Sequence, residues 1–277
     1  HRAVLKDGTN VVVKIIKADF EASFRRDVRR MKRWIRMGLF FNPRLRKVGN
    51  PIGLLAHIED YTLRELNLMN EIDGRQQLIE RAHGIEKHFA MPKLKFPKMW
   101  ESLSNEHILV MEEVTHPTLE DHLEAGTLTW PDMLQLFRIH GAFMFGLGTF
   151  HGDLHPGNAM MDDEGNFFFI DTGAICNAPE HVRNALFGFF FFLAKGELRS
   201  AFDAMLTMAA VRPTGKTLET YYASMNELYA GFVGTSVSEV SLTEQMMKTV
   251  KAAVLAGCAF GEEAFPIIRS LMYMDGM

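Results

Sequence analysis

The segment at residues 151–158, which reads HGDLHPGN, constrains the fold more than any other part of the chain. It places an acid, Asp153, five residues before an amide, Asn158. A second acid, Asp171, follows the apolar residues 167–170 and precedes a glycine by two positions. One carboxylate can accept a hydroxyl proton, while the amide oxygen and the second carboxylate can hold Mg²⁺ against a triphosphate. The pattern therefore predicts a phosphoryl-transfer centre in this loop-rich region.

A lysine stands inside an apolar, β-branched run near the start of the chain. Residues 11–16 read VVVKII, which predicts a strand, and the Asp-Gly pair at residues 7–8 predicts the hairpin turn before it. An unpaired ammonium in such a strand is costly, so Lys14 requires a reason to be there. In a phosphoryl-transfer site this lysine neutralises the α- and β-phosphates, and a glutamate on the following helix fixes it. We expect Glu65 to be that glutamate, with Glu59 as the rival.

Each of these features has a simpler explanation when it stands alone. Lys14 would be an edge-strand lysine with its ammonium in solvent, Glu65 a surface residue of a helix, and Asp171 part of a turn. Their order along the chain argues against coincidence. The lysine strand, glutamate helix, second apolar strand, acid–amide loop and final strand with its acid occur in the order that a protein kinase has.

The second apolar strand is predicted over residues 107–111, which read HILVM. The last residue of this strand and the three residues after it fall where a hinge would present main-chain groups to adenine. They are Met111, Glu112, Glu113 and Val114. From residue 119 onward the chain is predicted to be mostly helical. The sequence therefore predicts an α+β, protein-kinase-like fold with two lobes. We expect a β-rich N-lobe with inserted helices over residues 1–115 and a helical C-lobe over residues 116–277.

Other segments and the composition indicate where the protein works. Between Arg25 and Arg36 a predicted amphipathic helix carries seven basic residues against one acid. A long helix is predicted from about residue 52 to residue 72. The apolar run at residues 185–194 is half of the roughly 20 residues that a membrane span needs, so it predicts a buried helix. A net charge of −4 gives no general attraction to nucleic acid, and two cysteines without CxxC spacing favour a reducing, cytoplasmic setting.

Two departures separate the chain from peptide kinases. The tripeptide Ala178-Pro179-Glu180 spells the motif that ends an activation segment, but it follows Gly173 almost at once and leaves no room for a peptide-docking loop. Gly152 stands where peptide kinases have an arginine that pairs with an activation-loop phosphate. Ordinary peptide-kinase activity is therefore disfavoured.

Together these motifs resemble the UbiB family of atypical kinase-like proteins over nearly the whole chain. Residues 151–158 look like the family's H-[AG]-D-x-H-P-G-N loop, and residues 12–14 look like its V-A-[VI]-K strand. Arg2-Ala3 is similar to the end of its Q-V-[YH]-R-A strand, and residues 109–112 to its V-L-V-M-E hinge. The family's Lys-x-Gly-Gln helix and alanine-rich nucleotide loop would precede His1, so we expect a fragment that begins after that loop.

The chain departs from the family pattern at two places. In the family, a glutamate six residues before the ion-pair glutamate belongs to an ExD signature. Glu59 and Glu65 have this separation, but the signature's aspartate would then fall on Tyr61. Thr172 replaces the phenylalanine of DFG, which removes a packing residue and leaves the metal ligand Asp171 in place.

The resemblance implies an atypical kinase or ATPase that binds ATP and Mg²⁺. Its catalytic residues would be Lys14, Glu65 and Asp153, and its metal ligands Asn158 and Asp171. It also implies a role in ubiquinone biosynthesis, with lipid-like quinone precursors and other proteins of that pathway as partners. A cytoplasmic protein on the inner membrane face is expected, where the basic helix would contact anionic lipid. The alternatives are a small-molecule phosphotransferase of the aminoglycoside or choline type, with Asp153 as base, and a nucleotide-binding scaffold with negligible turnover.

Overall fold

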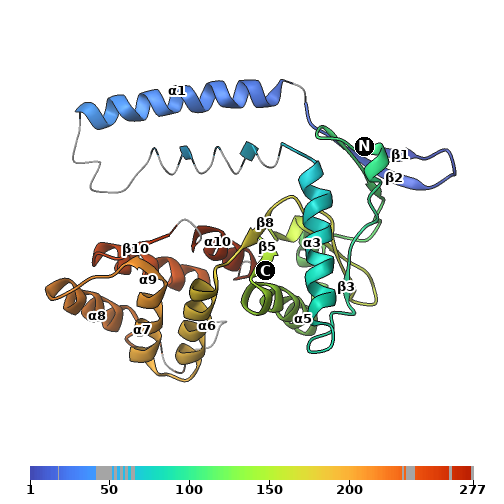
Figure 1. Ribbon diagram of the computed structural model, residues 1–277. Helices are drawn as coiled ribbons and strands as arrows, with labels where there is room; N and C mark the ends of the chain where they lie inside the picture. Colours follow the sequence, from blue (N-terminus) through green and yellow to red (C-terminus); the bar gives the residue numbers. More distant parts are fainter. Residues whose placement is uncertain are drawn as a thin grey trace. The chain divides into compact units, whose positions relative to one another are not determined.

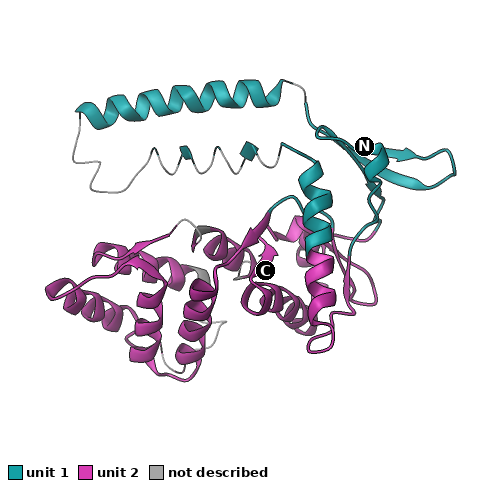
Figure 2. Cartoon of the chain, viewed as in Figure 1, with its two compact units in different colours: residues 1–77, 96–115, 170–174 teal, residues 78–95, 116–169, 175–277 magenta. Residues whose placement is uncertain are grey.

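The chain divides into two units that are interleaved in the sequence (Figure 2). Unit 1 comprises residues 1–77, 96–115 and 170–174, and unit 2 comprises residues 78–95, 116–169 and 175–277. The computed structural model describes residues 1–17, 19–41, 52, 55–56, 59, 62–63, 66–232, 234, 241–261 and 264–275 (Figure 1). The predicted lobe boundary after residue 115 stays a prediction.

An antiparallel sheet with strand order β1-β2-β4 is the centre of unit 1. Its strands are β1 (Arg2–Val4), β2 (Asn10–Ile15) and β4 (Ile108–Glu112). The predicted hairpin is confirmed, with Ala3 opposite Val11, and Gly8 takes the left-handed φ of 89° that the turn requires. Both predicted apolar strands of this unit are therefore present.

The register between β2 and β4 places Lys14 on the apolar face of this sheet. Lys14 lies opposite Leu109, and Val12 lies opposite Met111. Because side chains alternate along a strand, these four share one face. Leu109 and Met111 form a buried cluster with Leu68, and Val12 packs against it. The ammonium therefore emerges from an apolar surface, where it needs a partner.

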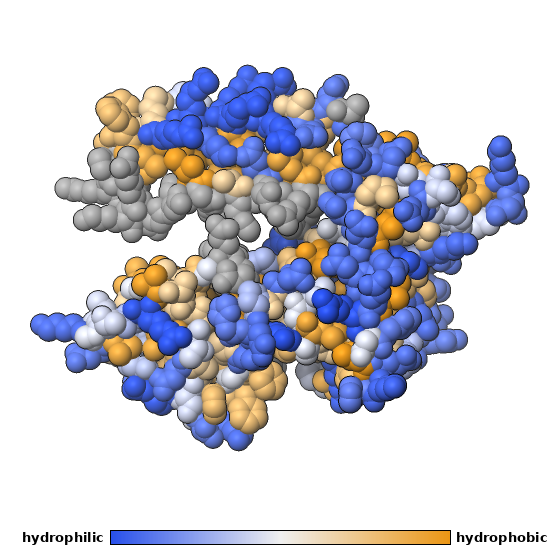
Figure 3. Space-filling model, viewed as in Figure 1, coloured by the Kyte–Doolittle hydropathy of each residue, from blue (hydrophilic) through white to orange (hydrophobic). Residues whose placement is uncertain are grey.

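The basic helix of unit 1 is α1 (Phe20–Phe41), as predicted. Val28 and Leu39 are its buried residues, whereas Met31 is 52% exposed. The surface over α1 combines strongly hydrophilic and hydrophobic residues (Figure 3). A short 3₁₀ helix, η2 (Glu101–Leu103), precedes β4.

The predicted helix from residue 52 to residue 72 is wrong in its C-terminal part. Residues 66–68 are not helical, and a separate helix, α3, spans Met69–Ile85. The Asn67 side-chain oxygen accepts a hydrogen bond from the amide of Met69 at 3.0 Å. This bond satisfies one of the amides that have no partner inside the first turn of a helix.

Unit 2 is mainly helical and carries several small sheets. One has the order β3-β7-β6, formed by β3 (Leu94–Lys95), β7 (Phe167–Phe169) and β6 (Ala159–Met161). The others pair β5 (Thr149–His151) with β8 (Ile175–Asn177), and β9 (Ala209–Val211) with β10 (Ala259–Phe260). The helices are α4 (Leu119–Glu124), α5 (Trp130–Gly141), the π-helix η3 (Ala142–Leu147), the 3₁₀ helix η4 (Pro156–Asn158), α6 (Glu180–Ala194), α7 (Leu198–Met208), α8 (Lys216–Leu228), α9 (Leu242–Leu255) and α10 (Ala264–Asp275).

The apolar run at residues 185–194 is part of α6, and only one side of this helix is buried. Leu186 and Phe189 are 1% exposed, whereas Phe187 and Phe191 are 56% and 44% exposed. The prediction of a helix is confirmed, but the prediction that the run is buried holds for one face only. Within the described residues, no helix combines the length and apolarity needed to cross a membrane.

Candidate active site

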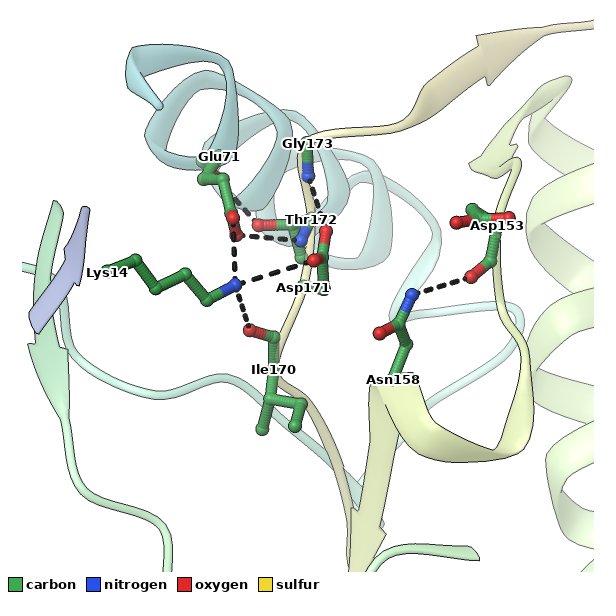
Figure 4. Close-up of polar contacts among 8 residues, drawn as sticks. All are labelled: Lys14, Glu71, Asp153, Asn158, Ile170, Asp171, Thr172 and Gly173. Carbon is green, nitrogen blue, oxygen red and sulfur yellow. Dashed lines mark hydrogen bonds and ion pairs between the residues drawn. The ribbon is translucent and has the colours of Figure 1, made fainter. Parts of the chain in front are cut away.

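The ammonium of Lys14 is enclosed by acidic and carbonyl oxygens of unit 1 (Figure 4). Its Nζ donates to Glu71 Oε1 at 2.8 Å, to the carbonyl oxygen of Ile170 at 3.2 Å and to Asp171 Oδ2 at 3.4 Å. Glu71 is a residue of the first turn of α3, and Asp171 lies two residues after the end of β7. The structure thus brings the predicted Lys14 and Asp171 together.

The glutamate that fixes Lys14 is Glu71, and not the predicted Glu65. Glu65 lies outside the described residues. The rival, Glu59, forms an ion pair with Lys32 of α1. Glu71 takes the role because the first turn of α3 lies beside the Lys14 face of the sheet, where Ile72 packs against the Leu109 cluster. When Glu71 is the ion-pair glutamate, the glutamate of the family's ExD signature, six residues earlier, falls on position 65. The aspartate of that signature then falls on Asn67.

The charges of this cluster do not balance, because two carboxylates share one ammonium. Burial alone would lower the pKa of Lys14, but the attraction of Glu71 and Asp171 raises that pKa above its ordinary value. Burial raises the pKa of the Glu71 carboxyl, and the attraction of Lys14 does not offset burial and the nearby Asp171 carboxylate together. The excess negative charge favours a further cation beside Asp171.

Thr172 ties the Asp171 segment to α3. Its Oγ1 donates to the carbonyl oxygen of Glu71 at 2.7 Å, and its amide donates to Glu71 Oε2 at 3.2 Å. Thr172 is fully buried. From the sequence, Thr172 was expected only to remove a packing phenylalanine, and its hydrogen bonds to Glu71 were not predicted. A small hydroxylated residue beside a metal-ligand aspartate was the signal that could have indicated them.

The loop with Asp153 belongs to unit 2 and is held by its own side chains. The amide of Asp153 donates to His151 Nδ1 at 3.1 Å, and the amide of Gly157 donates to His155 Nδ1 at 3.1 Å. The Asn158 amide nitrogen donates to the carbonyl oxygen of Asp153 at 2.9 Å (Figure 4). Since a carbonyl can only accept, this bond fixes the amide of Asn158 with its oxygen turned away and able to bind a cation.

The loop with Asp153 and the segment with Asp171 are each flanked by strands that pair within unit 2. Ala159 of β6 lies opposite Phe169 of β7, and His151 of β5 lies opposite Ile175 of β8. Asn158 stands one residue before Ala159, and Asp171 stands two residues after Phe169. The predicted amide and the second acid therefore flank the paired strands β6 and β7: Asn158 directly precedes β6, and Asp171 is the second residue after β7.

The donor chemistry fits a magnesium ion. A carboxylate and an amide oxygen are hard ligands, and Mg²⁺ is bound through one or two such groups with phosphate and water oxygens. Among the described residues, no group of three or more histidine, cysteine, aspartate and glutamate side chains could hold a metal ion. The Asp171 carboxylate, with its side chain 38% exposed, and the Asn158 amide oxygen are each a donor of this kind.

The predicted hinge comprises the last two residues of β4, which ends at Glu112, and the two residues after it. Met111 is buried in the Leu109 cluster. The Glu112 carboxylate accepts a hydrogen bond from the amide of Lys98 at 2.9 Å, and Glu113 forms an ion pair with Arg2 at 2.7 Å. Contact of adenine with the main chain of Met111, Glu112, Glu113 and Val114 stays a prediction.

His140 of α5 is buried within unit 2. Its Nε2 lies 2.7 Å from Ser270 Oγ, and its ring packs edge-on against Phe150. Burial, with a smaller contribution from His151, lowers the pKa of His140 to about 3. The imidazole is therefore neutral throughout the physiological range.

A lysine paired with a glutamate and facing the aspartate of a D-x-G segment is the arrangement of a kinase-like domain. The sequence profile of the ABC1 atypical kinase-like domain matches residues 1–205. The chain therefore belongs to this family. Its mixed α+β, kinase-like fold is the one that the sequence predicted.

Curated relatives are similar along the whole chain at low identity. The chain is 24% identical to Probable protein kinase UbiB of Aeromonas salmonicida and 23% identical to the protein of the same name from Sodalis glossinidius, with 100% of this chain and 51% of each relative covered. An uncharacterized protein of Mycobacterium tuberculosis is 26% identical over 80% of this chain and 46% of its own length. The chain thus spans about half the length of the curated relatives it matches.

A solved structure has a similar fold. It is the complex of Rv3197 with erythromycin from Mycobacterium tuberculosis, which matches with a TM-score of 0.61 at 17% identity. The match covers 99% of this chain and 70% of that protein.

The pairing of Lys14 with Glu71 can be measured by a double-mutant cycle in urea unfolding. Lys14→Met and Glu71→Gln should show a coupling of roughly 1–3 kcal/mol, because the side chains are 29% and 6% exposed. The Arg25–Glu21 pair of α1, with side chains 45% and 48% exposed, is the control and should couple by only about 0.3–0.5 kcal/mol. Equal coupling in the two cycles would contradict the assignment of Glu71.

The neutral His140 predicts a pH dependence of stability. Below about pH 6.5 the unfolded chain binds a proton at this residue, whereas the folded chain does not until about pH 3, so stability falls as the pH falls. Between pH 6 and 5, His140→Gln should reduce the slope of unfolding free energy by about 1.4 kcal/mol per pH unit. The exposed His107, changed to Gln, should keep the wild-type slope. A slope unaltered by His140→Gln would show that this residue is not buried as a neutral ring.

Proposed function

We propose that the protein containing this chain is an atypical kinase or ATPase that binds Mg²⁺-ATP through this domain. The observation that carries the proposal is the contact of Lys14 Nζ with both Glu71 Oε1, at 2.8 Å, and Asp171 Oδ2, at 3.4 Å. An ammonium fixed in this way is suited to neutralise phosphate oxygens beside a metal-binding carboxylate. Membership of the ABC1 atypical kinase-like family supports the same activity.

The remaining groups take their roles from their chemistry. Asp153 would accept or orient the proton of the attacking hydroxyl or water, and Asn158 and Asp171 would hold Mg²⁺. The Lys14 ammonium would orient the phosphates. Main-chain groups of residues 111–114 would bind adenine. Bound Mg²⁺ would neutralise the charge that develops on the phosphate oxygens during transfer.

Support for a role in ubiquinone biosynthesis comes from the family resemblance and from relatives named Probable protein kinase UbiB. We propose that the acceptor or allosteric partner is a lipid-like quinone precursor or another protein of that pathway. Asp171→Asn in the full-length gene should then fail to restore growth that depends on ubiquinone. Full rescue would argue against this role.

Two alternatives predict different responses of ATP turnover. A small-molecule phosphotransferase would turn over ATP faster when aminoglycosides or amino alcohols are added, with Asp153 as base. A scaffold would bind Mg²⁺-ATP and release no phosphate. ADP formation and phosphate release, each measured with and without these alcohols, separate the three activities: hydrolysis gives both products, transfer to an alcohol gives ADP without phosphate, and a scaffold gives neither.

The roles of the two acids predict distinct defects in the full-length protein. Asp153→Asn should lower ATP turnover by about 10²-fold or more while it keeps Mg²⁺-dependent nucleotide binding, because it removes the proton acceptor. Asp171→Asn should lose the Mg²⁺ dependence of binding as well, because it removes a metal ligand. Binding is followed by calorimetry and turnover by phosphate release.

The exposed Asp163, in the turn between β6 and β7, is the matched control. Asp163→Asn should behave as the wild type in both assays. Wild-type turnover in Asp153→Asn would rule out its role, and turnover in all variants would point to a contaminating ATPase.

We also propose that α1 contacts an anionic membrane surface. Arg26, Arg29 and Arg33 are exposed at i, i+3 and i+7, so they lie on one side of the helix. Trp34, Met37 and Phe41, exposed by 68%, 44% and 77%, follow the same spacing. Basic side chains combined with exposed aromatic residues are typical of helices that lie in a lipid interface.

Sedimentation with vesicles of phosphatidylglycerol and phosphatidylcholine tests this contact. The protein should bind at low salt and be released as salt rises, since each basic residue near the surface contributes about 1 kcal/mol. Changing Arg26, Arg29 and Arg33 to Gln should weaken binding strongly. The same change at three exposed basic residues elsewhere, Arg212, Lys216 and Lys251, should not. Absence of binding at low salt would end the proposal.

A further inference from the structure

Helix α10 contacts the loop that carries Asp153, and both belong to unit 2. Arg269 donates two hydrogen bonds to the carbonyl oxygen of Gly152, from Nε at 3.1 Å and from Nη2 at 2.8 Å. The next residue, Ser270, donates to the carbonyl oxygen of His151 at 3.2 Å. Two neighbouring residues of one helix therefore hold two consecutive carbonyl groups of the loop.

A third contact lies one turn further along α10. The ring of Tyr273 packs against the ring of His155, with 5.9 Å between centroids. His155 in turn accepts a hydrogen bond from the amide of Gly157. The helix thus contacts the loop on both sides of Asp153.

The bonds from Arg269 bear directly on the direction of the Asp153 side chain. The Gly152 carbonyl and the Asp153 amide belong to one peptide unit, which is planar. Arg269 holds the oxygen end of this plane, and His151 Nδ1 accepts from the N–H end at 3.1 Å. With both ends held, the plane cannot rotate without breaking these bonds. The carbonyl of Asp153 is held as well, because it accepts from Asn158 Nδ2 and from the amide of His155, each at 2.9 Å. With the peptide planes on both sides held, the Cα–Cβ direction of Asp153 is set.

We propose that Arg269 is a positioning residue for Asp153. It acts from a distant helix on position 152, where peptide kinases have an arginine of the loop itself and this chain has Gly152. α10 lies outside residues 1–205, which the family profile matches. The inference rests on the proposed ATP turnover for its catalytic consequence, but not for its structural one.

Ser270 supports this arrangement through a buried chain of hydrogen bonds. Its hydroxyl has one proton, which it donates to the carbonyl of His151. His140 Nε2, 2.7 Å from Ser270 Oγ, must then be the protonated nitrogen that donates to the hydroxyl. This leaves His140 Nδ1, which is buried and has no hydrogen-bond partner within the part of the chain that the structure describes, as an acceptor. An unsatisfied acceptor is tolerated more often than an unsatisfied N–H, so the direction of the chain is fixed.

The test uses Arg269→Met and Arg269→Lys in the full-length protein. Arg269→Met removes both hydrogen bonds, and kcat for ATP should fall by roughly ten- to a hundredfold, as expected when a reacting group is displaced by a fraction of an ångström to one ångström. KM for Mg²⁺-ATP should not change, because Lys14 and Asp171 are untouched. Arg269→Lys should restore part of kcat through a single hydrogen bond, and it decides the question should Arg269→Met fail to fold.

The matched control is Arg183→Met on α6. Arg183 also donates to main-chain carbonyls, those of Phe145 and Gly146, but it does not hold the Asp153 loop. It should lower stability comparably and leave kcat unchanged. Hydrogen–deuterium exchange of the peptide covering residues 151–158 supplies a readout that does not depend on turnover, and Arg269→Met alone should accelerate it.

The outcomes are distinguishable. Loss of kcat with faster exchange in Arg269→Met, partly reversed by Lys and absent in Arg183→Met, supports the positioning role. Unchanged kcat and exchange in Arg269→Met overturn it, as does an equal effect in Arg183→Met, which would indicate a general loss of stability. Should the wild type form no ADP, the proposed function fails, and the exchange result alone decides whether Arg269 positions the loop.

Discussion

The partly buried ammonium of Lys14 is the constraint on which the candidate site depends. An unpaired charge on the apolar face of the sheet would be costly, so folding requires Glu71 and Asp171 to reach it. These residues stand 57 and 157 positions away in the sequence. One strand, one helix and one short segment therefore have to converge before the charge is satisfied. The same convergence leaves an excess of negative charge where the chemistry of a kinase-like domain needs a cation.

The segment of residues 170–174 connects this constraint with the rest of the molecule. Its contacts place it in unit 1, where Thr172 bonds to Glu71 and Ile170 to Lys14. Its covalent neighbours are β7 and β8, which belong to unit 2. Residues 78–85 of α3 likewise belong to unit 2, whereas Glu71 in the same helix belongs to unit 1. The hydrogen bonds between Thr172 and Glu71 therefore join the two chain segments that pass from one unit to the other.

The sequence allowed the strands, Lys14 and Asp171 to be predicted because each has a local signal: β-branched runs, a lysine inside one, and an acid after another. The partner of Lys14 had no such signal: Glu59, Glu65 and Glu71 follow one another at intervals of six residues, and only the first two were considered. Only the contact with β2 and the interruption of the helix at residues 66–68 select Glu71. Arg269 could not be predicted at all, since it binds main-chain carbonyls, and these leave no trace in the residue types of the loop.

The two acids are held in different ways, and the difference matches their proposed chemistry. Asp171 contacts an ammonium directly, through Oδ2 at 3.4 Å from Lys14 Nζ. Asp153 is fixed through its main chain, and no hydrogen bond or ion pair among the described residues engages its carboxylate. A direct partner on that carboxylate would occupy the lone pairs with which a base accepts a proton. Orientation through the peptide plane, whose Gly152 carbonyl accepts from the Arg269 guanidinium, leaves those lone pairs available.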